Sequence, residues 1–339
     1  MVPPQPGDRF QRPEPQAADA AWRQTAMTQA LFNLLIFPGF LFLSLAGMVA
    51  EFCDRKLYAR MQNRQGPPWF QPFADFIKLS SKEDIIPEEA DPFMFRLMPL
   101  VALAASVCAI LYIPIWGRGA LLSFEGDLVI VVYLLTIPTM TFFLAGWYSA
   151  SLYSMIGAVR SLTQLLAYEV PLYLALLAPA CLADSWSLAG MAAYYGAHPW
   201  RWLLNLIGFG VGLVVMLGKL EKVPFDTPEA ETEIVAGAFT EYSGRLLALF
   251  RMAISIEMIV LASLLAAVFL PFGLGLGPLA GFLLYLLKIA LIIAMTSFLR
   301  TIFARFRIDQ MVDFCWRYVA SAAMLQLVIV IIAKGVLPQ

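Results

Sequence analysis

A run of acidic side chains lies between two long apolar stretches of the sequence, within residues 219–251. Carboxylates next to a bilayer are costly to keep, and they commonly mark ion pathways or proton relays. The chemistry that this pattern predicts is therefore the transfer of protons or ions. The run holds six of the chain's 24 acidic residues, which are Glu221, Asp226, Glu229, Glu231, Glu233 and Glu241.

The start of this run has the pattern of a helix beginning at Thr227-Pro228, with a capping hydroxyl followed by proline. On such a helix Glu229 and Glu233 share a face with Asp226, whereas Glu231 points elsewhere. We expect the pKa values of three acids on one face to rise and spread, unless cations or water intervene. The alternative is a solvated acidic loop that only connects two helices.

Three more charged residues stand inside apolar runs of the sequence: Glu169, Glu257 and Lys288. Arg160 and Gln164 precede Glu169 near helical spacing, which predicts one polar stripe along a helix. Several such groups beside the acidic run favour a hydrated proton or ion route. The alternative for Glu169 is a buried ion pair with Lys288 that serves only packing.

The elements that must position these groups are membrane helices, since 60% of the 339 residues are hydrophobic. We predict an all-α polytopic membrane protein in which proline bends several helices. Residues 1–24 form a poorly ordered extracytoplasmic tail, and residues 25–339 form a single transmembrane domain. Eight spans are expected near Thr28–Ala50, Phe95–Trp116, Leu128–Tyr148, Leu162–Ala183, Trp202–Leu217, Leu246–Leu270, Leu279–Phe298 and Tyr318–Ala333.

Between the first two spans, Gly66-Pro67-Pro68 breaks any helix, and a short amphipathic segment follows. Its apolar side chains include Trp69, Phe73 and Ile77, and its polar ones Asp75 and Lys78. The segment is too short to span, which predicts an amphipathic helix in the membrane interface. A packed cytoplasmic helix is the alternative.

Orientation follows from the basic residues. The loops after the first, third, fifth and seventh spans carry sixteen of them with their flanks, against six on the opposite side. The excess predicts that these loops are cytoplasmic and that both termini lie outside the cell membrane.

The composition disfavours cofactors bound by this chain. Four widely spaced cysteines and one histidine supply no ligand set for iron–sulfur, haem or zinc, and no glycine-rich nucleotide motif is present. A net charge of −1 disfavours a nucleic-acid partner. We expect the chain to hold no metal, flavin or nucleotide, and any redox chemistry to belong to partner subunits.

Four segments in order carry a family resemblance: DRKLYARMQNRQGP from Asp54, QPFADFIKLSSKEDIIP from Gln71, GAVRSLTQLLAYEVP from Gly157 and PFDTPEAETEIVAGAFTEYSGRLLALFR from Pro224. A late basic segment, FLRTIFARFRIDQMVDFCWR, agrees with it. With these motifs the chain resembles the H-subunit (subunit 1) family of respiratory complex I and its relatives in energy-converting, membrane-bound [NiFe]-hydrogenases. The resemblance covers nearly the whole chain after the tail.

The resemblance implies a funnel of acids that connects a redox module to antiporter-like subunits. The implied coupling residues are Glu169, Asp226, Glu229, Glu231, Glu233 and Glu241, with which we group Arg160 and Lys288. The residues expected to face the hydrophilic subunits are Asp54, Arg55, Arg64, Asp75, Lys78, Arg245, Arg251, Arg300, Arg305, Arg307 and Asp309.

Two departures from complex I favour the hydrogenase branch. The segment between Gly66 and Gln71 is short, and Ile254-Ser255 replaces a carboxylate-plus-tyrosine pair, with Arg251 just before it. Both disfavour a quinone site. The first hypothesis is thus a membrane anchor and coupling subunit of a hydrogenase-type complex that moves H⁺ or Na⁺ across a prokaryotic cytoplasmic membrane. Its implied partners are NiFe-hydrogenase-like large and small subunits with iron–sulfur clusters, antiporter-like and small membrane subunits, and lipids.

Three alternatives remain at this point: the quinone-binding H-subunit of an NADH:quinone oxidoreductase, a stand-alone carboxylate-based ion transporter, and a purely structural anchor. The transporter lacks the internal repeat that many transporter folds show. The anchor leaves Glu169 and the acidic run unexplained.

Overall fold

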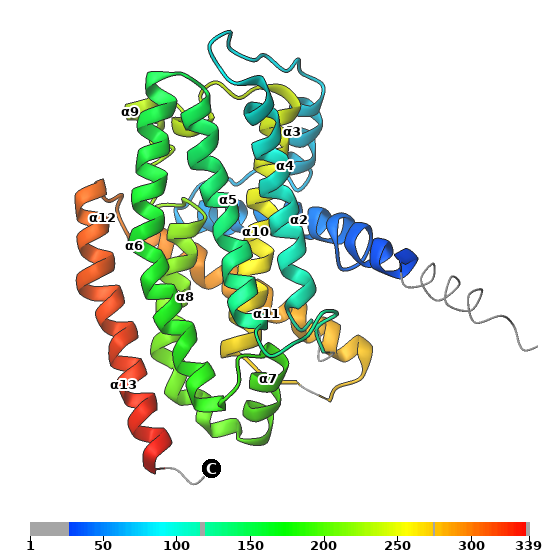
Figure 1. Ribbon diagram of the computed structural model, residues 1–339, viewed down its shortest axis with the longest axis vertical. Helices are drawn as coiled ribbons and strands as arrows, with labels where there is room; N and C mark the ends of the chain where they lie inside the picture. Colours follow the sequence, from blue (N-terminus) through cyan, green and yellow to red (C-terminus); the bar gives the residue numbers. More distant parts are fainter. Residues whose placement is uncertain (1–26, 116–118, 274, 337–339) are drawn as a thin grey trace, which may run out of the picture.

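The fold is a bundle of long helices, seen in a computed structural model (Figure 1). The structure describes residues 27–115, 119–273 and 275–336, except for the side chains of residues 231 and 232. The predicted tail, residues 1–24, lies outside this part of the chain. All regular elements within the described ranges are helices, as the composition predicted.

Eight helical segments in the described residues are long and apolar enough to cross a membrane, which confirms the predicted number. They are Met27–Met61, Pro92–Tyr112, Asp127–Tyr148, Leu152–Ala183, Pro199–Lys219, Gly244–Phe269, Pro278–Ile302 and Ile308–Val336. Within them lie α2 (Phe40–Met61), α4 (Pro92–Ala109), α5 (Asp127–Tyr148), α6 (Leu152–Ala183), α8 (Leu206–Lys219), α10 (Gly244–Phe269), α11 (Pro278–Ile302), α12 (Ile308–Phe314) and α13 (Ala320–Val336).

Several helices are interrupted by proline, as expected. The first segment breaks at residues 36–39, around Pro38, before α2 begins. Pro138 lies inside α5, and Pro171 and Pro179 lie inside α6, where each removes one backbone donor from the helical ladder. A π-helical stretch, Cys315–Val319, connects α12 to α13.

The centre of the bundle is α10, most of whose residues are apolar and buried. It packs against α2, α4, α8 and α11. In Figure 1 α5, α6, α8 and α13 stand upright, whereas α2 lies across them at a steep tilt. The upright helices hold the loops between them at two opposite ends of the molecule.

The short helices mark these two ends. α3 (Gln71–Ser80) and α9 (Glu231–Ile234) lie at one end, and α7 (Leu188–Ala197) lies at the other (Figure 1). α3 packs against α2 and α10, while Trp69, Phe70 and Ile77 remain exposed. The predicted amphipathic helix therefore exists, with one face on the bundle and large apolar side chains outside it.

Two predictions about helix bounds were wrong. α6 begins at Leu152, ten residues before the expected start. Its early turns are mostly apolar, and Leu152, Tyr153 and Val159 are exposed there, so the apolar run of this span extends further than expected. No helix begins at Thr227-Pro228; only the single turn of α9 forms, from residue 231. The hydroxyl of Thr227 donates to Gln164 Oε1, a contact with another helix, and caps nothing.

Candidate functional site

A cavity of about 400 Å³ lies where α2, α8, α10 and α11 meet the segment after α8. We call it the chamber, and we call residues 220–243 the acidic loop. Charged side chains form most of the chamber wall, since eleven of its lining residues are ionisable. These are Glu51, Asp54, Arg55, Lys219, Glu221, Lys222, Asp226, Glu229, Arg251, Arg300 and Arg305.

The acidic loop is fixed against α6 by the amide of Gln164. This buried side chain donates to the carbonyl of Gly218 at 2.7 Å and accepts from the hydroxyl of Thr227 at 2.7 Å. One side chain thus joins the end of α8 and the middle of the loop to the same point on α6.

Two glycines allow the loop backbone to lie directly on α6. A Cβ atom at Gly157 would come within 2.5 Å of Gly237 Cα. Gly237 itself has a φ of +54°, and a Cβ atom there would lie 1.8 Å from the carbonyl oxygen of Pro228. A side chain at Gly157 would therefore push the loop away from α6, and one at Gly237 would clash within the loop itself.

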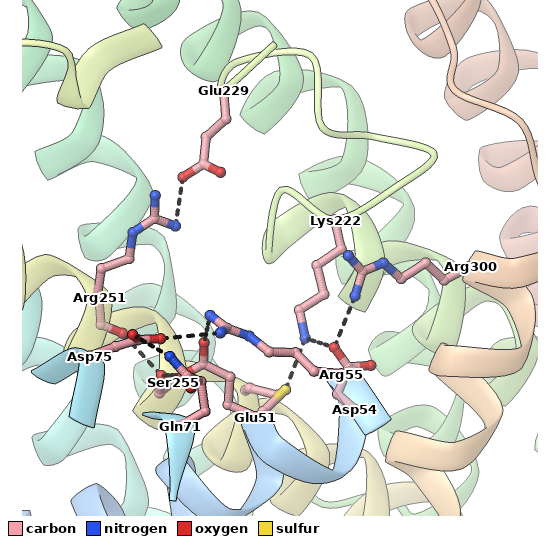
Figure 2. Close-up of polar contacts among 11 residues, drawn as sticks. Glu51, Asp54, Arg55, Gln71, Asp75, Lys222, Glu229, Arg251, Ser255 and Arg300 are labelled. Carbon is pink, nitrogen blue, oxygen red and sulfur yellow. Dashed lines mark hydrogen bonds and ion pairs between the residues drawn. The ribbon is translucent and has the colours of Figure 1, made fainter. Parts of the chain in front are cut away.

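Three acids of the loop each pair with a different arginine from another part of the chain. Asp226 contacts Arg305 at 2.8 Å, Glu229 contacts Arg251 at 3.1 Å, and Glu233 contacts Arg160 at 2.8 Å. In Figure 2, Arg251 extends from α10 toward Glu229 of the loop. The acids do not share one helix face, so the expected mutual repulsion is replaced by separate ion pairs.

The pKa values of these acids spread in both directions as a result. Burial raises the pKa of Asp226 against the opposing effect of Arg305. The hydrogen bond and charge of Arg160 lower the pKa of the exposed Glu233. The sequence predicted that these pKa values rise unless cations intervene, and at Glu233 a cation, Arg160, does intervene.

Glu221 is the acid that the loop does not compensate. Its side chain is buried, and its Oε1 accepts only the hydroxyl of Ser161, at 3.0 Å, among the described residues. Burial and then the charge of Glu229 raise its pKa from 4.5 to about 8. A carboxyl with a pKa raised in this way is suited to proton exchange near neutral pH. The sequence placed Glu221 in the acidic run, but the coupling set omitted it.

Asp54 organises one wall of the chamber. Its Oδ2 contacts Lys222 Nζ at 2.7 Å and Arg300 Nη1 at 3.1 Å, and its Oδ1 accepts from the hydroxyl of Ser297 at 2.6 Å. Figure 2 shows Lys222 and Arg300 converging on Asp54 from the loop and from α11. The prediction grouped Asp54 and Arg300 as docking residues, and the structure instead places both on the chamber wall, in contact.

A second group on α2 and α3 lies beside the first (Figure 2). Glu51 contacts Arg55 and accepts from the hydroxyl of Ser255 at 2.7 Å. Arg55 also reaches Asp75 at 3.5 Å, and Asp75 accepts from Gln71 at 2.8 Å. Sequence reasoning missed Glu51, although it brings a carboxylate from α2 next to Ile254-Ser255, where the expected carboxylate is absent.

Glu169 lies on α6 and contacts Thr136 of α5 and the hydroxyl of Tyr173 at 2.6 Å. The predicted stripe holds in part: Arg160 and Gln164 face the acidic loop, while Glu169 faces α5.

Lys288 donates to the backbone carbonyls of Leu270 and Phe272, at 2.5 Å each, and so caps the end of α10. The alternative of a Glu169–Lys288 pair is therefore wrong, because each group has nearer partners on a neighbouring segment.

The remaining candidates lie outside the chamber. Arg245 pairs with Asp84 at 2.9 Å near α3. Glu241 is half-buried, and Arg64, Lys78, Arg307 and Asp309 are exposed. The side chain of Glu231 lies outside the described residues. Within the described chain no three His, Cys, Asp or Glu side chains gather as a metal site requires. The docking roles of the exposed residues stay predictions.

The same arrangement of helices occurs in a solved structure. A chain of the membrane-bound sulfane sulfur reductase, an archaeal respiratory membrane complex, superposes with a TM-score of 0.76 and 26% identity, and the match covers 86% of this chain and 96% of that chain.

Sequence comparison gives closer relatives by identity. NADH-quinone oxidoreductase subunit 8 of Thermus thermophilus is 35% identical over 310 residues, covering 87% of this chain and 84% of that protein. The H-subunit of the NADH-quinone oxidoreductase of Carboxydothermus hydrogenoformans is 32% identical over 312 residues, covering 88% of each. The NADH dehydrogenase family model matches residues 33–331. The chain therefore belongs to the NADH dehydrogenase family and is a multi-pass membrane protein of the H-subunit type, from a respiratory complex.

Proposed function

We propose that this subunit couples electron transfer in a docked hydrophilic module to ion movement through the membrane part of its complex. The observation that carries the proposal is the uncompensated Glu221 carboxyl in a chamber otherwise lined by paired charges. A group that exchanges a proton near neutral pH, surrounded by charges that respond to it, is what a coupling site requires.

The chamber gives this coupling a direction. Its wall includes the acidic loop, which lies at the end of the molecule that also carries α3 (Figure 1). We place the redox module on this end, which the excess of basic residues makes cytoplasmic. From there protons would enter the chamber past the Glu229–Arg251 pair and reach Glu221. Glu169, which faces α5, would receive the proton next and pass it toward the neighbouring membrane subunits.

The kind of complex has two candidates. The names of the relatives at 32–35% identity favour an NADH:quinone oxidoreductase. The likeness to a chain of a sulfane sulfur reductase complex and the replacement of a carboxylate by Ile254 favour the hydrogenase-type branch. In both cases we propose that metal and flavin cofactors belong to the partners, and in the hydrogenase-type case that no quinone binds here. Of the two, the relatives give the NADH:quinone candidate the stronger support.

The subunits that co-purify with this chain separate the two candidates. A NiFe-type large subunit with paired cysteine motifs supports the hydrogenase-type branch, and NADH-oxidising subunits support the quinone-reducing one. Purification of this chain alone, with ion transport intact, would contradict both.

Glu221→Gln tests the coupling itself. It keeps the shape and a hydrogen-bonding amide but removes the titrating carboxyl. We expect the complex to assemble and its partner to reduce artificial dyes at the normal rate, while ion transport into vesicles falls at least tenfold. Asp184→Asn, in an exposed pair with Lys334, is the matched control and should transport normally. Transport by Glu221→Gln at the wild-type rate would remove Glu221 from the relay.

A further inference from the structure

A second buried acid lies below the chamber, on α10. The side chain of Glu257 is 1% exposed, and its nearest cation is Lys219 of α8, whose Nζ lies 3.3 Å from Oε1. Neither carboxylate oxygen of Glu257 has a hydrogen-bond partner among the described residues, so the ion pair with Lys219 is its main compensation there. A carboxylate in a membrane helix with unsatisfied oxygens is expensive, and such groups are kept for function more often than for stability.

Lys219 stands between this acid and the chamber. It lines the chamber, whereas Glu257 does not. The ammonium lies over the ring of Tyr168, 5.6 Å from its centroid, so the aromatic face holds the cation without fixing it to a single oxygen. A rotation of the Lys219 side chain toward the chamber, which it already lines, would uncover Glu257.

Glu221 is the counterpart on the chamber side. It follows Lys219 by two residues at the end of α8 and has no cation within 4 Å among the described residues. After burial and Glu229, the charge of Glu257 also raises the pKa of Glu221, so the charge on one acid affects the protonation of the other. With Glu221 protonated, the Lys219 ammonium lies between a neutral acid and Glu257, its ion-pair partner.

We propose that Glu221, Lys219 and Glu257 form a charge-exchange switch, in which a proton moves from Glu221 to Glu257 while the Lys219 ammonium moves from Glu257 toward Glu221. The O–H bond of Glu221 breaks, and one forms on Glu257. The chamber is large enough for water that carries the proton as far as Lys219, and the movement of Lys219 opens the last step to Glu257. The three groups carry no net charge before or after the exchange. A proton thus enters the membrane interior without the cost of an unpaired buried charge.

The inference rests on the proposed coupling function and assigns it an inner acceptor. A purely structural pair makes a different prediction, because replacing both partners of a buried ion pair by neutral side chains is commonly harmless. The decisive variant is the double replacement Lys219→Met with Glu257→Gln, made in the whole complex.

We expect the double variant to assemble and to reduce artificial dyes through its partner subunits as the wild type does, while ion transport in vesicles falls at least tenfold. The matched control is Asp184→Asn with Lys334→Met. It removes an ion pair at the C-terminal end of α6, away from the acidic loop, and should transport normally. Transport by the Lys219/Glu257 double variant within twofold of wild type would overturn the switch.

A second measurement keeps the test decisive if the double variant fails to assemble. Infrared difference spectra of the complex under redox cycling should show a protonated-carboxyl band that shifts in Glu257→Asp, which retains the acid. No shift in that variant would overturn the switch.

Failure of the switch and failure of the coupling function give different results. If Glu221→Gln abolishes transport and the double variant does not, the switch is wrong and the coupling function stands. If the wild-type complex moves no ions during turnover, the coupling function fails and the switch fails with it.

Discussion

Gln164 and Thr227 are joined by a 2.7 Å hydrogen bond across 63 positions of the chain, and neither side chain is charged. This contact, with the 2.7 Å bond from Gln164 to the carbonyl of Gly218, holds the acidic loop in place. The charged groups of the chamber thus depend on a neutral amide for their position.

Gln164→Leu should therefore disturb the chamber without changing any charge. It leaves the Thr227 hydroxyl without its acceptor, and it leaves the Gly218 carbonyl with the backbone N–H of Glu221, at 3.2 Å. A buried group left unpaired costs about 1–3 kcal/mol. We expect a lower melting temperature of the purified complex and reduced ion transport. Thr227→Val, which removes only one of the two bonds, should have the smaller effect on both. Equal effects would show that the Gly218 contact contributes nothing.

Asp54→Asn should prevent assembly. The replacement leaves Lys222 and Arg300 facing one another on the chamber wall without an anion. Leaving one member of a buried ion pair uncompensated costs about 3–5 kcal/mol. Immunoblots of membranes should show little assembled complex. Ser297→Ala removes only a neutral donor to Asp54 and should assemble; similar amounts of complex from both variants would contradict the role given to the ion pairs.

Glu221 should make the stability of the complex depend on pH with a definite sign. Its pKa is raised from 4.5 to about 8, so between these values the folded protein binds more protons than the unfolded chain. The contribution of this group is complete below pH 4.5 and is lost as pH rises through about 8. Melting temperatures of wild type and Glu221→Gln should therefore diverge across this range, with the variant less dependent on pH. Parallel curves would contradict the buried state of Glu221.

Cysteine labelling tests the orientation. On a background without native cysteines, Ser81→Cys and Ala304→Cys place thiols at exposed positions of the end that we assign to the cytoplasm. Both should be protected from an impermeant thiol reagent in intact cells. Gln16→Cys, in the tail, should react. The reverse pattern would move the docking side of the complex to the outside.

Quinone content tests the kind of complex. The chamber is lined mainly by ion pairs, and Ile254 stands where a carboxylate would be expected to meet a quinone head. On the hydrogenase-type candidate we expect the purified complex to hold no tightly bound quinone and to resist quinone-site inhibitors. Strong inhibition, or quinone extracted in stoichiometric amount, would assign the complex to the NADH:quinone branch.

The spans and the acidic residues could be predicted from the sequence because both depend on local properties. About twenty apolar residues define a membrane helix wherever it packs. The partners of the acids could not be predicted in the same way, since Asp54 meets Arg300 across 246 positions. Spacing along a helix indicates which side chains share a face, but not which helix that face meets. For this reason the alternative of a Glu169–Lys288 pair could be excluded only from the structure.

Glu51 was missed for the same reason. In the sequence Glu51 and Glu257 are single charges next to or inside apolar segments, and only the packing of α2 and α8 against α10 shows which side chain each one contacts. The helix expected at Thr227-Pro228 failed because a tertiary hydrogen bond used the capping hydroxyl. A signal for Glu221 was present in the sequence: an acid between Lys219 and Lys222, just after an apolar run.

The close contact of Gly157 with Gly237 has a consequence for how this subunit can diverge. Backbone packed on backbone fixes the path of the acidic loop, so the loop does not need any particular carboxylate to keep its shape. Acids on it can be gained, lost or moved in evolution while the fold persists. The two glycines should therefore constrain the lineage more strongly than the charges do, and different coupling ions could be served by one unchanged scaffold.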